Sequence, residues 1–145
     1  MPKFNFRMQG YLNLKSKMED QRKLEYGQAV SELERERAKL KLLEAQRAET
    51  ISAFREEGQK AQTAGLYNNY LTWLKEAIGI QTESVRKAEA EAERRRAALT
   101  EAMKERKMLE TLKEKHYVDF IREQNLTEQK NVDEVVSFRQ SSREY

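Results

Sequence analysis

The sequence contains a single proline, Pro2, and only five glycines among 145 residues. Proline inside a helix removes a backbone donor, clashes with the preceding turn and costs about 3 kcal/mol. Its absence from the rest of the chain permits helices longer than those of ordinary globular domains. The residues that dominate are strong helix formers, and 37% of the chain is charged. We therefore expect an all-α fold built from very long helices.

Cysteine is absent, which excludes a disulfide framework and is typical of a reducing compartment. Long apolar runs are also missing, since no stretch approaches the ~20 apolar residues that cross a bilayer. The opening residues lack the apolar core of a secretory signal. We therefore expect a cytoplasmic protein without direct membrane insertion.

Two glycines, Gly58 and Gly65, bracket the only stretch that has the composition of a loop. Glycine just past a helix end is the commonest C-cap, because it adopts the left-handed conformation without a side-chain penalty. This pattern predicts helices over about residues 5–57 and 68–140, with a turn at 58–67. Two long helices joined by a short turn fold back antiparallel, so that the numbers of facing residues add up to roughly 126.

The second predicted helix carries the clearer apolar stripe. Alternate steps of three and four residues reach fifteen positions, of which ten are apolar. The stripe consists of Leu71, Leu74, Ile78, Gln81, Val85, Ala88, Ala92, Arg95, Leu99, Ala102, Arg106, Leu109, Lys113, His116 and Phe120. The stripe of the first helix is looser and changes register near Gly27. Polar residues in such a stripe weaken a coiled coil and leave it adjustable.

The second helix is expected to outrun the first, so residues from about 122 onward have no partner within the chain. Aromatic residues gather at both ends of the predicted hairpin: Phe54, Tyr67, Tyr70 and Trp73 at the turn, and Phe4, Phe6, Tyr11, Tyr117 and Phe120 at the open end. The expected fold is a long two-helix antiparallel coiled-coil hairpin with a C-terminal helical overhang. Residues 1–145 are expected to form one unit.

Signals for chemistry are weak. The only histidine, His116, has no second histidine or cysteine to complete a zinc site. No phosphate loop or nucleophile motif occurs, and a two-helix fold offers no enclosed cleft. The net charge is only +3, and the basic run Arg94–Arg96 is flanked by glutamates, unlike a DNA-binding basic helix. We expect neither enzymatic activity nor a metal, a cofactor or nucleic-acid binding.

Three segments of the sequence stand out in order along the chain: Phe4–Gln9 with the acidic Glu19–Gln21, then Tyr70–Ile78, then Glu128–Glu134 with Arg139 behind it. Together they resemble the flagellar export protein FliJ family. The first is similar to the family's N-terminal pattern of Phe-x-Phe, a basic residue, Leu and Gln, and Met8 stands where the family more often has leucine. The second resembles the family's tyrosine-rich start of the second helix. The third resembles the C-terminal signature and is the most specific of the three.

This resemblance implies a non-enzymatic component of the bacterial flagellar type III export apparatus, required for flagellum biogenesis, motility and chemotaxis. Its fold would be similar to the central shaft of rotary ATPases. The implied partners are the flagellar export ATPase hexamer, the cytoplasmic domain of the export-gate membrane protein and flagellar export chaperones. The implied location is the cytoplasm, peripherally at the inner face of the cell membrane at the flagellar base.

The resemblance also implies two sets of partner-binding residues. The export-gate positions are Tyr70, Trp73, Leu74, Ala77 and Gln81, and the ATPase-ring positions are Asp133, Glu134 and Arg139. The alternative interpretation is a generic cytosolic coiled-coil scaffold or self-assembling spacer. A filament-forming coil would continue its apolar stripe through residues 58–66, which this sequence does not do.

Overall fold

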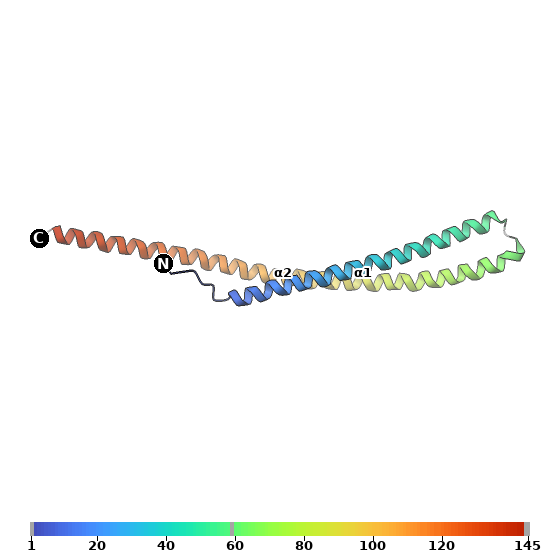
Figure 1. The fold of residues 1–145 in the computed structure, drawn as a ribbon, viewed down its shortest axis with the longest axis horizontal. Coiled ribbons are helices and arrows are strands. Elements are labelled where there is room, and N and C mark those ends of the chain that lie inside the picture. Colours follow the sequence, from blue (N-terminus) through green and yellow to red (C-terminus); the bar gives the residue numbers. More distant parts are fainter. Residues whose placement is uncertain (1, 59, 144–145) are drawn as a thin grey trace. The chain divides into compact units, whose positions relative to one another are not determined.

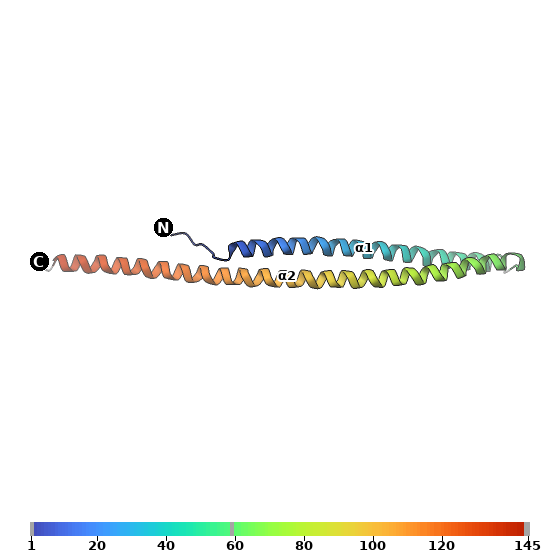
Figure 2. The ribbon, with the colours of Figure 1, turned by 90° about the horizontal axis from the view of Figure 1, so that it is seen from below.

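The computed structural model describes residues 2–58 and 60–143, which contain two long helices and no strand. Helix α1 spans Gln9–Glu56 and α2 spans Ala61–Arg143. The two helices pack against each other as an all-α hairpin, which confirms the predicted fold class (Figure 1 and Figure 2). Contacts divide the chain into a hairpin unit, Asp20–Glu101, and a terminal unit, Met1–Glu19 with Ala102–Tyr145.

The hairpin unit contains the connection between the helices. Gly58 has a φ of 71°, a left-handed conformation that residues with a Cβ adopt at a cost, and its amide donates to the Arg55 carbonyl at 3.1 Å. Gly58 therefore ends α1 as the sequence predicted. The next helix starts almost at once, because the amides of Thr63 and Ala64 already bond to the carbonyl of Lys60.

Helix α2 thus begins at Ala61, earlier than the predicted start near residue 68, and Gly65 lies inside it. Alanine, glutamine and threonine at 61–64 tolerate a helix, and one interior glycine costs only about 1 kcal/mol. Because the connection is shorter than predicted, the residues of α1 beside it face residues of α2 that lie about one helical turn closer to the start of α2 than predicted. Phe54, for example, packs on Tyr67 with ring centroids 4.9 Å apart.

In the terminal unit, α1 begins at Gln9 rather than near residue 5, because the preceding aromatic residues pack in a non-helical segment. The Phe4 ring lies 5.3 Å from that of Tyr117 and 5.5 Å from that of Phe120, and Phe6 lies 5.7 Å from His116. Residues two apart would point to nearly opposite sides of a helix. Both phenylalanines contact α2 only because the backbone here is not helical.

The apolar interface of each unit is narrow, with few buried side chains. In the hairpin unit the buried apolar residues are Leu74, Val85 and Ala92; in the terminal unit they are Phe6, Leu12, Ala102 and Leu109. Phe6, Leu12 and Leu109 form a cluster with Phe4 and Leu112 packed against it. The buried residues of α2 all belong to the apolar stripe predicted from the sequence.

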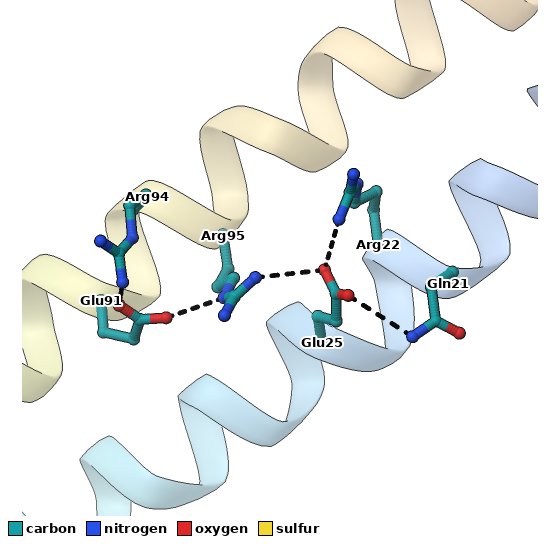
Figure 3. Close-up of polar contacts among 6 residues, drawn as sticks. All are labelled: Gln21, Arg22, Glu25, Glu91, Arg94 and Arg95. Carbon is teal, nitrogen blue, oxygen red and sulfur yellow. Dashed lines mark hydrogen bonds and ion pairs between the residues drawn. The ribbon is translucent and has the colours of Figure 1, made fainter.

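Polar residues of the predicted stripe pair across the helices. In the hairpin unit, Arg95 donates to Glu25 at 3.4 Å and to Glu91 at 2.7 Å (Figure 3). Glu25 also accepts from Arg22 at 3.0 Å, and this hydrogen bond is the main reason why the pKa of Glu25 is lowered. Arg37 pairs with Glu89 at 3.1 Å. These contacts link the two helices at positions where the interface has polar instead of apolar side chains.

The terminal unit has a more deeply buried polar contact. Glu19 is only 3% exposed and forms an ion pair with Arg106, which raises the pKa of that guanidinium. One turn away, Lys15 pairs with Glu105 at 2.7 Å, and this hydrogen bond raises the pKa of the lysine. Burying a charge is costly unless it is paired, so these contacts favour one alignment of the helices over its neighbours.

Candidate partner-binding surfaces

One face of α2 in the hairpin unit exposes an unusual number of large apolar side chains. Leu66 is 73% exposed, Tyr70 42%, Trp73 56% and Ile80 71%. Together with Ala77 they follow the alternating spacing of three and four that keeps residues on one side of a helix. We call Leu66, Tyr70, Trp73, Ala77 and Ile80 the aromatic stripe.

The aromatic stripe is ordered by its own contacts. The rings of Tyr70 and Trp73 are stacked, with centroids 5.9 Å apart and planes inclined by 14°. Next to them, a shallow groove runs between α1 and α2, lined from α2 by Leu66, Tyr67 and Tyr70 and from α1 by residues that include Ala53. A hydrogen bond with the Glu57 carboxylate is the main cause of the raised pKa of Tyr67. Stacked, exposed aromatic rings beside a groove are typical of protein-binding surfaces.

The five residues assigned to the export gate by resemblance do not share one environment. Tyr70 and Trp73 are exposed and Ala77 is half-buried, so all three are accessible to a partner. Leu74 has 0% exposure and packs inside the helix interface. Gln81 is half-buried and donates to the backbone carbonyl of Glu36 at 2.9 Å and to its carboxylate, which lowers the pKa of Glu36.

Leu74 can therefore support the exposed residues but cannot form a surface itself, and Gln81 is held by its hydrogen bonds to Glu36. Two residues of the same face, Leu66 and Ile80, were missed by the sequence reasoning. They continue the spacing of Tyr70, Trp73 and Ala77 in both directions. That continuation was the signal that could have found them.

The last part of α2 presents a second candidate surface in the terminal unit. We call residues 125–143 the tail segment; every one of them is exposed. Large apolar side chains are included, such as Val132, which is 60% exposed, and Phe138, which is 74% exposed. An ordered helix that is exposed on all sides while carrying valines and a phenylalanine is typical of a segment that a partner encloses.

The three residues assigned to the ATPase ring lie on this tail segment. Asp133, Glu134 and Arg139 are all exposed, and none forms an ion pair with another described residue. By helical spacing, Arg139 lies on the side of Val132 and Val135, whereas the two acids lie on other sides. A flat partner surface could not contact all three charges at once, but a surrounding one could.

The described residues offer no group of three or more potential metal ligands. His116 is exposed and lies edge-on to Phe6, 5.7 Å away, where it completes the aromatic packing. No described helix is apolar enough over its length to cross a membrane.

A protein-family model matches almost the whole chain. The model described as flagellar FliJ protein matches residues 4–144. Comparison with curated proteins and with solved structures gives no match. The matched range includes both helices, the connection between them and the tail segment.

Proposed function

Because the chain belongs to the flagellar FliJ protein family, a component of flagellar protein export, we propose that it couples the export ATPase hexamer to the export gate. The observation that carries this proposal is the pair of separate exposed apolar surfaces, the aromatic stripe and the tail segment. Each lies on a long helix and has no covering element among the described residues. The protein acts as one unit over residues 1–145 and has no catalytic activity of its own.

The aromatic stripe is proposed as the surface for the cytoplasmic domain of the export-gate membrane protein. Tyr70, Trp73 and Ala77 make the contact, since aromatic side chains supply most of the affinity at protein interfaces. Leu74 and Gln81 are positioning residues, because they fix α2 against α1 and so orient the stacked rings. This assignment divides the five residues into two roles.

The tail segment is proposed as the part that enters the ring of the export ATPase. A helix inside a ring is contacted around its whole circumference. Asp133, Glu134 and Arg139 can therefore all be recognised although they lie on different sides. The exposed valines supply apolar contact that a short charged helix would lack.

Export chaperones are the third proposed class of partner, and the protein works in the cytoplasm at the inner face of the membrane, at the base of the flagellum. It neither binds nucleic acid nor inserts into the membrane. The alternative, a generic coiled-coil scaffold or self-assembling spacer, predicts that exposed apolar residues serve contacts between copies of the chain. In that case their substitution would change self-assembly and leave the flagellar partners bound.

The test is the double substitution Tyr70→Ala with Trp73→Ala, measured as binding of the full chain to the purified cytoplasmic domain of the export gate. Both side chains are largely exposed, so helix content should stay unchanged, while affinity should fall at least tenfold, since a hot-spot residue contributes about 2 kcal/mol or more. Swimming should be lost in cells that carry the variant.

Leu42→Ala is the matched control, because Leu42 is 61% exposed on α1 of the same unit and lies outside the aromatic stripe. This variant should bind the gate domain normally. If the double variant binds as tightly as the unmodified protein, the stripe is not the gate-binding surface.

A further inference from the structure

A third surface lies on α2 of the terminal unit, on the side that faces away from α1. Three lysines gather there around an exposed methionine, Met108, which is 71% exposed. A shallow depression is lined by these residues and their neighbours, which we call the lysine stripe: Lys104, Lys107, Met108, Thr111, Leu112 and Lys115. Five of the six are exposed, and Leu112 is half-buried where it packs on the apolar cluster.

None of the three lysines forms an ion pair with a carboxylate in the described part of the chain. Glu110, three residues after Lys107, pairs instead with Arg106 at 2.7 Å within α2. Exposed Glu101 and Asp119 lie about one helical turn before Lys104 and one turn after Lys115. Three ammonium groups without an ion pair therefore lie between these two carboxylates.

Exposed arginines of α2 in the hairpin unit are balanced in a different way. Arg86 forms two hydrogen bonds with Glu83, and Arg96 forms two with Glu93, each pair within one turn. Those faces are neutralised by their own sequence. The lysines of the lysine stripe form no such ion pairs in the described part of the chain, so their charge is available to an external group.

The floor of the depression is apolar, since the stems of lysine side chains cover apolar surface while their ammonium groups stay in water. Met108 and Leu112 complete this floor, and methionine adapts readily to the shape of a partner. A group that fits here has an apolar side chain flanked by carboxylates. The stripe extends over about three helical turns, or ~17 Å, which matches one short helix laid beside it.

We infer that the lysine stripe binds an acidic amphipathic helix of a partner protein. The apolar residues of that helix meet Met108 and Leu112, and its carboxylates pair with Lys104, Lys107 and Lys115. This surface is distinct from the aromatic stripe and from the tail segment.

An anionic membrane fits the same face less well. Exposed Glu114 and Asp119 lie close to Lys115 in the sequence, and a flat surface of lipid headgroups would meet them together with the lysines. Membrane-surface helices also bury a broad bulky apolar face, whereas this stripe exposes chiefly one methionine. A helix laid along residues 104–115 ends one turn before Asp119, so it meets the lysines first.

The first test uses the full chain and a fluorescein-labelled 14-residue helical peptide, rich in glutamate, with leucines at positions i, i+3 and i+7. Binding is measured by fluorescence anisotropy. The triple charge reversal Lys104→Glu, Lys107→Glu and Lys115→Glu should weaken binding at least tenfold, because each exposed ion pair contributes about two- to fivefold. Added salt should weaken binding to the unmodified protein.

The matched control is Lys41→Glu, Lys75→Glu and Lys87→Glu in the hairpin unit, where all three lysines are exposed. Net charge changes equally in both triple variants. The control should lose less than threefold in affinity. Equal losses in the two variants would mean that only the total charge matters, and the inference would be overturned.

The second test removes the apolar contact without changing charge. Met108→Ser should weaken binding of the leucine peptide about three- to fivefold and leave binding of a serine-substituted peptide unchanged, as coupled contacts do. No effect on the leucine peptide would overturn the inference. Tighter binding to vesicles of phosphatidylcholine and phosphatidylglycerol than to the peptide, lost in the Lys104/Lys107/Lys115 variant, would identify a membrane surface instead.

Discussion

Leu74→Ala should destabilise the hairpin unit more than any other single leucine truncation in the first turns of α2. Leu74 has 0% exposure, so alanine in its place leaves a cavity and loses the burial energy of the removed carbon atoms. Leucine-to-alanine changes in cores cost about 2–5 kcal/mol, depending on how far the surroundings can close the gap. Because the interface is only two helices wide, the neighbouring side chains can partly close the cavity. We therefore expect the free energy of unfolding to fall by ~2–3 kcal/mol.

This loss can be measured by urea unfolding followed by circular dichroism at 222 nm. With a urea dependence of about 1–3 kcal/mol per molar, the midpoint should fall by roughly 1 M or more. Leu66→Ala is the control, because Leu66 lies in the same helix and is 73% exposed. The two variants change helix propensity equally, and the surface change should stay within about 0.5 kcal/mol.

The difference in free energy of unfolding between the two variants therefore measures the contribution of burying the Leu74 side chain. Should both unfold at the same urea concentration, Leu74 is not packed between the helices. Its assignment as a positioning residue would then fail, and a direct contact with the export gate would become the better explanation of its role. Leu74→Met, which nearly conserves volume, should remain close to the unmodified protein.

Four further changes probe other features. Gly58→Ala should destabilise the protein by about 1 kcal/mol in the same urea assay, because its backbone is left-handed; no change would mean that the connection relaxes. Arg106→Glu should lower the urea midpoint, and adding Glu19→Arg should recover part of the loss; a double variant no better than the single would contradict the pairing. The pKa of Glu36 is lowered in the folded protein, so its contribution to the free energy of unfolding is complete above the ordinary glutamate pKa of about 4.3. This contribution is lost as pH falls through the lowered pKa of the folded state. Glu36→Gln should therefore reduce the drop in urea midpoint between pH 7 and pH 3. Deleting residues 125–145 should leave the midpoint almost unchanged but abolish stimulation of the export ATPase, and a truncated chain that still stimulates it would exclude the tail segment as the ring contact.

The helix interface could largely be predicted from sequence. Every buried apolar residue of α2 belongs to the apolar stripe that was predicted from alternate steps of three and four residues. That spacing follows from helix geometry alone. Even the polar positions Arg95 and Arg106 were in it. The predicted register placed the partner of Arg106 within one residue of Glu19. It missed Glu25, the partner of Arg95, by more than one helical turn, since facing residues depend on where the chain turns.

The ends of the helices were harder to predict because local propensity and tertiary packing compete there. Gly58 and Gly65 have the same intrinsic preference, and only the first occupies a conformation that requires glycine. Residues 5–8 have helix-compatible composition, yet Phe4 and Phe6 gain more by packing together on α2 than by joining α1. Sequence alone gives no measure of that gain.

The sequence could not predict which of the candidate partner-binding residues are exposed. The resemblance assigned Leu74 and Gln81 together with Tyr70 and Trp73, because all of them lie in one matching segment. Which of them faces outward depends on the rotation of α2 about its axis. That rotation is set by packing along the whole interface, for example by Val85 and Ala92 further along the helix.

The tail segment has a consequence for how a partner captures it. An isolated helix of this length would be marginal in water, because its first turn must fix several residues before any hydrogen bond forms. Here the packed part of α2 already provides that nucleus, and each further residue only extends it. Hydrogen exchange along the tail should therefore quicken gradually toward residue 143 rather than in one step. A partner that encloses the tail segment therefore binds a helix that is already formed. Its binding should slow hydrogen exchange most near residue 143, where the free helix unwinds first.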